Sequence, residues 1–277
     1  MHRYWAWAVL FCVPALGVER DTLDAALARM YDFDFPASQQ ILDRYITTHP
    51  DEPVPYAFRA SAYLFFELDR MGILESEFFT DDNRIADKKK KMEPDPGIRT
   101  RFLKAVSDAE SRADAALKVN PDDRQALFAM CIAQGVSTDY MAFVEKKQIA
   151  SLAPAKRSNT YAQRLLKLDP KFYDAYLTAG ISEYTLGSLP FFIRWFVHLE
   201  NVSGDKKRGV ERLELVSREG HYFRPFSKIL LATIALREKR PRDAQNYLQE
   251  LAHDYPGNPL FRRELDKVAA KTGIAAN

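Results

Sequence analysis

The side chains able to do acid–base or metal chemistry are scattered along this 277-residue chain. No His-Glu-x2-His or Cys-x2-Cys spacing joins them into a zinc site, and neither a nucleophile elbow nor a dinucleotide glycine motif is present. The isolated histidines are His49, His198, His221 and His253. An acidic pair at 81–82 lies in a polar stretch without the enclosure that shifts a carboxyl pKa. We therefore expect no enzymatic activity, no metal and no cofactor.

Phosphate and nucleic-acid chemistry are also disfavoured by the sequence. The stretch Ser-Gly-Asp-Lys-Lys-Arg-Gly at 203–209 is followed by Val210 and Glu211, whereas a P-loop needs Lys and Ser/Thr after its second glycine. Forty Lys and Arg against thirty-eight Asp and Glu give a net charge of +2, which is too balanced for a nucleic-acid footprint. The lysine run 88–91 lies among acidic residues and is interpreted as a solvated loop.

The feature best suited to binding is an aromatic segment, Leu-Pro-Phe-Phe-Ile-Arg-Trp-Phe-Val-His-Leu at 189–199. Eight of these eleven residues are large and apolar, and helical spacing gathers Arg194 and His198 on a narrow polar side. Leaving the apolar side chains in water would forgo on the order of 10–20 kcal/mol, so something must cover them. The segment is too short to span a bilayer. Three environments could bury these side chains: the protein's own core, a partner or ligand, or a membrane surface. An apolar stripe of this kind most often packs in the protein's own core.

A repeated phrase positions this segment. A small residue is followed four and seven residues later by positions on the same helical face, and a proline comes five residues after that. The copies are Ser38-Leu42-Tyr45-Pro50, Ala109-Ala113-Ala116-Pro121, Ser158-Ala162-Leu165-Pro170 and Ala244-Leu248-Leu251-Pro256, with Gly209-Leu213-Val216 followed by His221 as a fifth. The phrase resembles the second helix of tetratricopeptide (TPR) repeats, which ends in the same way.

The first-helix half of the TPR signature is looser. Tyr56, Ala60 and Tyr63 keep its aromatic, small and tyrosine positions, and Tyr176 and Gly180 keep two of them, with Glu183 where the family has tyrosine. The resemblance spans about residues 19–272 and implies an all-α, right-handed helical solenoid. A second local similarity, over Leu189-Pro190, the aromatic segment and 204–213, is to the eukaryotic inclusion-body-clearance TPR family, and it implies no function here.

The spacing of the repeats predicts enlarged connections between paired helices at about 71–95, 135–153 and 187–203. Helical spacing in the second insertion predicts that it extends a helix. Residues 258–272, with Phe261, Leu265 and Val268 turned inward, are expected to form a capping helix. Cys131 occupies the small-residue position of a first helix and is expected to be buried.

The N-terminus resembles a secretory signal. Residues 1–17 combine Arg3, an apolar stretch and the small-x-small end Ala-Leu-Gly, which predicts cleavage near Val18 and a periplasmic or secreted domain 18–277 without a transmembrane span. The alternative is a buried first helix of a cytoplasmic protein.

These observations favour a noncatalytic scaffold or adaptor of the bacterial cell envelope, which binds a protein or peptide through the solenoid groove or the inserted edge. The alternative is a periplasmic carrier of a lipid or other apolar molecule, and contact with a membrane surface remains compatible with either. The candidate binding residues are aromatic or lie beside the aromatic segment: Trp195, Phe191, Arg194, His198, Phe78, Phe79, Tyr56, Tyr63 and Tyr176.

Overall fold

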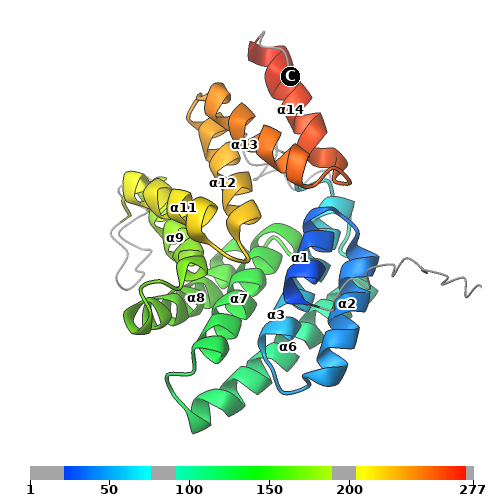
Figure 1. Ribbon diagram of the computed structural model, residues 1–277, viewed down its shortest axis with the longest axis vertical. Helices are drawn as coiled ribbons and strands as arrows, with labels where there is room; N and C mark the ends of the chain where they lie inside the picture. The colour runs from blue at the N-terminus through cyan, green and yellow to red at the C-terminus, as the bar shows by residue number, and fades with distance from the viewer. Residues whose placement is uncertain (1–21, 76–91, 189–203, 273–277) are drawn as a thin grey trace, which may run out of the picture.

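The protein is all-helical throughout the part that the computed structural model describes, residues 22–75, 92–188 and 204–272 (Figure 1). Expectations for residues 1–17 and for the aromatic segment therefore lie outside the described residues. The α-helices are α1 Leu23–Tyr31, α2 Phe35–Thr48, α3 Val54–Arg70, α6 Pro96–Val119, α7 Arg124–Asp139, α8 Gln148–Leu168, α9 Tyr176–Ser188, α11 Lys206–Glu219, α12 Arg224–Arg237, α13 Pro241–Asp254 and α14 Pro259–Thr272. A π-helical turn, Tyr140–Val144, continues α7, and a 3-10 turn, Tyr173–Ala175, precedes α9.

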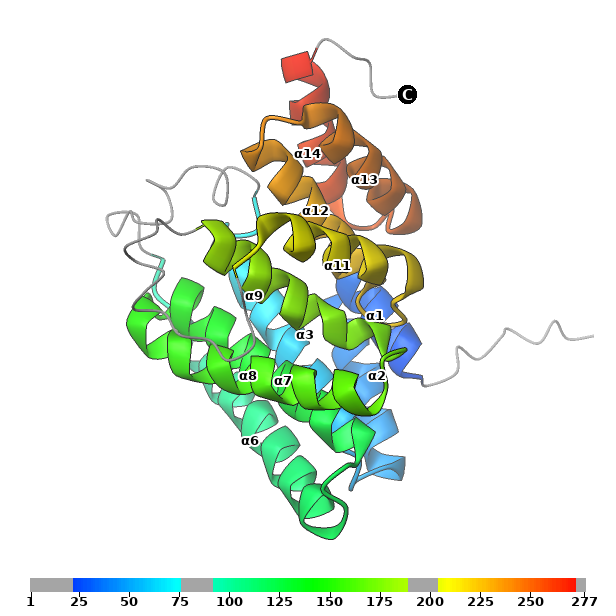
Figure 2. The same cartoon turned by 90° about the vertical axis from the view of Figure 1, so that its left-hand side faces the viewer.

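The helices pack in antiparallel pairs that follow one another along the chain. The pairs are α1 with α2, α3 with α6, α7 with α8, α9 with α11 and α12 with α13, and each second helix also contacts the first helix of the following pair. Figure 2 shows α6 at the bottom, α7, α8, α9 and α11 above it and α14 at the top, with the first pair, α1 and α2, to the side at mid-height. The predicted all-α class is confirmed.

Each copy of the repeated phrase lies on the second helix of a pair. Its small residue is buried in every copy: Ser38, Ala109, Ser158, Gly209 and Ala244. Gly209 shows why the position must be small, because a Cβ there would lie 2.6 Å from the backbone nitrogen of Tyr184 on α9. The phrase therefore marks the close contact within each pair.

The same helices also end in the same way. Each of them stops two residues before the proline or His221, and the backbone N–H of the next residue donates to the carbonyl four residues back, as His49 does to Tyr45. Proline cannot continue a helix, so the recurring proline favours this boundary in four of the five helices, and α11 ends in the same way with Gly220 before His221.

Among the described residues, the connection inside each pair has one residue in the left-handed region. These residues are Phe33, Gly72, Lys146, Gly204 and Lys239, with φ between 58° and 68°. A left-handed residue turns the chain sharply at the end of a helix. Two of the five are glycines, which adopt this conformation without steric cost, whereas the other three carry a Cβ.

The expected insertion at 135–153 does not form a loop. Residues 135–144 lengthen α7 through the π-helical turn, α8 begins at Gln148, and only 145–147 connect the two. The apolar side chains of this stretch explain the difference, because Tyr140 and Val144 are buried in the core. The prediction that the insertion extends a helix is confirmed.

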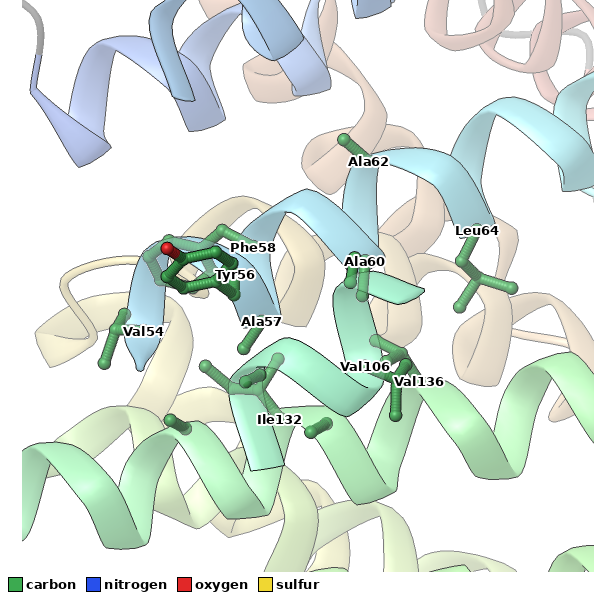
Figure 3. Close-up of a cluster of buried hydrophobic side chains, with 14 of the residues drawn as sticks. Val54, Tyr56, Ala57, Phe58, Ala60, Ala62, Leu64, Val106, Ile132 and Val136 are labelled. Carbon is green, nitrogen blue, oxygen red and sulfur yellow. The ribbon is translucent and has the colours of Figure 1, made fainter. Parts of the chain in front are cut away.

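The centre of the fold is the contact between α3 and α7. Figure 3 shows Ala57 and Ala60 of α3 on the side that faces Ile132 and Val136, and the small alanines allow the two helices to approach closely. Among the described residues, one helical run, Arg124–Val144, is long and apolar enough to cross a membrane. It is the core helix α7, with 61% of its most apolar window buried inside the protein, so the fold itself accounts for its composition.

The last described helix, α14, buries Phe261, Leu265 and Val268 as expected for a capping helix. The turn before it also returns to α1. The amide of Asn258 donates to the carbonyl of Tyr31 at 2.8 Å, and the backbone N–H of Gly257 donates to the Asp32 carboxylate at 2.7 Å. Figure 1 shows the start of α14 above α1, so the turn that leads into the last described helix contacts the end of the first.

Candidate functional site

The aromatic residues expected to bind a partner fall into two groups. Phe78 and Phe79, and the four candidates of the aromatic segment (Phe191, Arg194, Trp195 and His198), lie outside the described residues. Tyr56, Tyr63 and Tyr176 are described, on two different helix pairs, and the structure does not bring Tyr176 together with the other two.

Two of these tyrosines hold the repeat boundary. Tyr56 is buried and its hydroxyl donates to the carbonyl of Pro50 at 3.0 Å, while the Tyr176 hydroxyl donates to the carbonyl of Pro170 at 3.2 Å. In both cases the acceptor lies six residues before the tyrosine, so the bond links the end of one pair to the start of the next. Tyr63 is partly exposed, with the guanidinium of Arg101 5.9 Å from its ring centre. Tyr176 is partly exposed as well, so of the three described tyrosines only Tyr56 is buried.

The inner surface formed by α1, α3 and α7 is filled by the protein itself. Tyr222, Phe223 and Phe226, at the start of α12, form what we call the aromatic plug. The Tyr222 ring centre lies 5.0 Å from that of Phe58, and Phe226 lies 5.4 Å from Phe65. This is the surface that the groove hypothesis assigned to a partner.

A buried carboxylate positions the plug. Asp174, in the 3-10 turn, accepts hydrogen bonds from the backbone N–H groups of His221 and Tyr222 at 3.2 Å and of Phe223 at 2.9 Å. Gly220 allows this approach, because a Cβ there would lie 3.1 Å from the Asp174 carboxylate and 2.6 Å from the Val216 carbonyl. Burial raises the pKa of Asp174, and the three N–H donors only partly offset that effect.

The helices that flank the two remaining insertions end and begin at one edge of the molecule. We call this place, where α3 and α9 end and α6 and α11 begin, the inserted edge. Figure 2 shows the described ends of α3 and α9 together on its left-hand side. The residues 76–91 and 189–203 that join these helices to α6 and α11 lie outside the described residues.

A buried glutamate closes the base of the first insertion. Glu67 of α3 has no exposed surface, and both its oxygens accept from Arg70 at 2.8 Å. One of them also accepts the backbone N–H of Asp95 at 2.7 Å, and Asp95 in turn caps α6 by accepting from Ile98. The start of α6 is therefore fixed to the end of α3 by charge-assisted hydrogen bonds.

The third insertion is closed in the same way. Glu183 of α9, also without exposed surface, accepts the backbone N–H of Asp205 at 3.1 Å and pairs with Arg212 at 3.4 Å. Asp205 caps α11 through the N–H groups of Lys207 and Arg208. The sequence carried one signal for this arrangement, since Glu183 stands where the TPR pattern has tyrosine.

The π-helical turn brings two further polar groups to this edge. Tyr140 stacks on Phe102 with ring centres 4.3 Å apart, and burial together with nearby Glu67 raises its pKa to about 12. Its buried hydroxyl makes no hydrogen bond with any described residue. Asp139 precedes it, and loss of hydration raises the pKa of its carboxyl group to about 7. Sequence reasoning did not identify either residue as part of a site.

The described residues contain no group of three His, Cys, Asp or Glu side chains placed to hold a metal ion. Two open surface depressions lie along α14 and between α11 and the α12–α13 turn. Comparison with protein-family models, with curated proteins and with solved structures finds no match to this chain.

Proposed function

We propose that this protein is a noncatalytic adaptor that binds a protein or peptide partner through the inserted edge. The carrying observation is that the aromatic plug occupies the inner surface, whereas two long insertions start from rigidly clamped ends at one edge. A helical array of the TPR kind has these two surfaces for recognition. With the inner surface filled, the edge is the surface that remains.

The two clamps, by which we mean the hydrogen bonds of Glu67 with Asp95 and of Glu183 with Asp205, support this proposal energetically. A binding segment held at both ends loses less conformational entropy on capture than a free one. Glu67 and Glu183 are buried charges that each need several hydrogen bonds to be tolerated, and those bonds fix the starts of α6 and α11. The aromatic segment at 189–199 supplies the residue types that dominate binding hot spots. A location in the bacterial cell envelope is part of the proposal and depends on the signal-like residues 1–17.

Photo-cross-linking in the native host tests the proposal. A photoreactive phenylalanine analogue at Trp195 is expected to give a defined cross-linked protein, and the same analogue at Val119, an exposed position on the opposite edge, is the matched control. Trp195→Ala should abolish capture of that protein while leaving the melting temperature nearly unchanged. Phe192→Ala should instead lower stability by about 3–5 kcal/mol if this side chain packs in the core.

Three outcomes would contradict the adaptor. The first is cross-linking that is equal at Trp195 and Val119. The second is a Trp195→Ala variant that keeps its partner. The third is a reproducible bound mass of a few hundred daltons in native mass spectrometry, without a protein partner, because it would identify a carrier instead.

A further inference from the structure

Exposed large apolar side chains concentrate where α6 and α8 begin. Of the seven exposed large hydrophobic residues in the described part of the chain, four lie in 92–104 or 139–157: Met92, Leu103, Ile149 and Leu152. The Arg99 guanidinium joins these two segments through an ion pair of 2.9 Å with Glu145. We call this surface the α6–α8 corner.

Ile149 is the prominent member of the corner. It is 86% exposed in the first turn of α8, and Leu152 follows one turn later on the same side of the helix. The intervening and following residues, Ala150 and Ala153, are exposed as well, so the first two turns of α8 present a small apolar face. An isolated exposed apolar residue needs no explanation, but a contiguous apolar face does.

The corner is also basic. Residues 92–104 and 139–157 together contain seven Lys and Arg and four Asp and Glu, a local excess of three positive charges in a chain whose total net charge is +2. Lys146 and Lys147 come directly before the apolar face, and Lys156 and Arg157 follow it along α8. Apolar side chains bordered by cations fit the boundary between the headgroups and acyl chains of an anionic bilayer.

We infer that the α6–α8 corner docks on an anionic lipid surface, with Ile149 and Leu152 entering the headgroup region and the neighbouring cations facing lipid phosphates. A protein partner fits these observations less well, because the exposed apolar side chains of Ile149 and Leu152 are bordered by cations rather than by the mixed polar rim of a protein interface. The inference does not depend on the adaptor proposal, since it uses neither Trp195 nor a protein partner.

Vesicle co-sedimentation of the purified protein tests this inference. The wild type is expected to bind vesicles of phosphatidylcholine mixed with phosphatidylglycerol, to bind phosphatidylcholine alone weakly, and to dissociate at high salt. The double variant Ile149→Ser and Leu152→Ser should bind the anionic vesicles about tenfold more weakly, because two apolar side chains no longer enter the bilayer. The matched control is Val119→Ser, which removes an 89% exposed side chain from the opposite edge and should bind as the wild type does.

Both substituted positions are exposed, so unchanged helical melting should confirm that each variant folds. The inference is overturned if the wild type does not bind anionic vesicles, if binding is indifferent to salt, or if the double variant and Val119→Ser behave alike. Loss of the cross-linked protein partner in the double variant, with no vesicle binding by the wild type, would also overturn it by assigning the corner to a protein.

Discussion

At the level of single residues, Asp139 is expected to make stability depend on pH. Its pKa of about 7 in the folded protein lies above the ordinary value of 3.8, because burial disfavours the charged form. The contribution of Asp139 to stability is therefore complete below about pH 4 and is lost as the pH rises from about 4 to about 7. Asp139→Asn should raise the free energy of unfolding by roughly 2–4 kcal/mol at pH 8 and change it little at pH 4.

Urea unfolding of both proteins across this range measures the effect. Asp122→Asn, which changes an exposed carboxylate in the turn after Pro121, is the control and should leave the pH profile as it is. Parallel profiles for wild type and Asp139→Asn would show that Asp139 is hydrated in the folded protein.

Cys131 is expected to resist thiol reagents. Its side chain is buried between Ser158 and Thr178, with its sulfur 3.2 Å from the Thr178 hydroxyl, and burial raises its pKa. In a Cys12→Ser background, labelling should be slow in the native state and become rapid in urea. Adding Val119→Cys, at an exposed position, should produce one fast-reacting thiol per chain. Fast native labelling without that second thiol would contradict the packing of α7 against α8 and α9.

At the level of the helices, the left-handed connections identify a place to stabilise the protein. Lys239 holds a φ of 59° between α12 and α13, which costs a residue with a Cβ about 1 kcal/mol or more. Lys239→Gly should therefore raise the free energy of unfolding by about 0.5–1 kcal/mol. The same glycine placed at exposed Ala115 inside α6 should lower it by about 1 kcal/mol. Denaturant unfolding compares the two, and a loss of stability at both positions would refute the assignment of Lys239 to a left-handed turn.

Among these predictions, disrupting the Glu67 clamp at the base of the first insertion should cause the largest loss of stability. Glu67→Gln keeps the shape of the side chain but removes the charge that Arg70 and the N–H of Asp95 depend on, and it should lower stability by about 3–5 kcal/mol. Glu52→Gln, in an exposed turn, should cost less than about 1 kcal/mol. Thermal and urea unfolding measure both, and similar small losses would mean that α6 starts without help from Glu67.

The sequence was sufficient for the second helix of each pair and for the position where that helix ends, because these depend on local signals. The recurring small residue, followed by proline in four copies and by His221 in the fifth, identified the five second helices, and the inward face of α14 followed from its periodicity. The form of the second insertion was only partly predictable, since the same residues can lengthen a helix or form a loop until their burial is known. The TPR resemblance itself stays a prediction.

The clamps, the plug and the corner could not be found in this way, because each depends on contacts between distant parts of the chain. Glu67 and Asp95 are 28 residues apart, and Asp174 meets Phe223 across 49 residues. A sequence pattern shows that Tyr222 and Phe223 are aromatic, but it does not show which surface they cover. For the same reason, the sequence pattern made Tyr56 a candidate binding residue, whereas in the structure this side chain is buried and its hydroxyl donates to the carbonyl of Pro50.

At the scale of the whole molecule, the helix pairs do not form an open stack in which each pair touches only its neighbours. Tyr31 of α1 packs on Tyr255 with ring centres 5.5 Å apart, and its hydroxyl donates to the carbonyl of Tyr222 in the plug. Asn258 adds a hydrogen bond from the turn before α14 to the end of α1. The first pair is thus supported on both sides, by α3 and by the last pairs.

This closure changes how the protein should open. The outermost units of a linear array unravel first, so their amides exchange with solvent fastest. Here the amides of α1 should exchange nearly as slowly as those of the central helix α7, and hydrogen–deuterium exchange with mass spectrometry can compare them directly. Removing one closing bond with Asn258→Ala should speed exchange in α1 about tenfold while leaving α7 unchanged. Fast exchange of α1 in the wild type would mean that the outermost helices unfold first, as in an open array. Slow exchange would mean that the described fold unfolds as a single unit. In that case a protease would find no locally unfolded helix to cleave within the described residues.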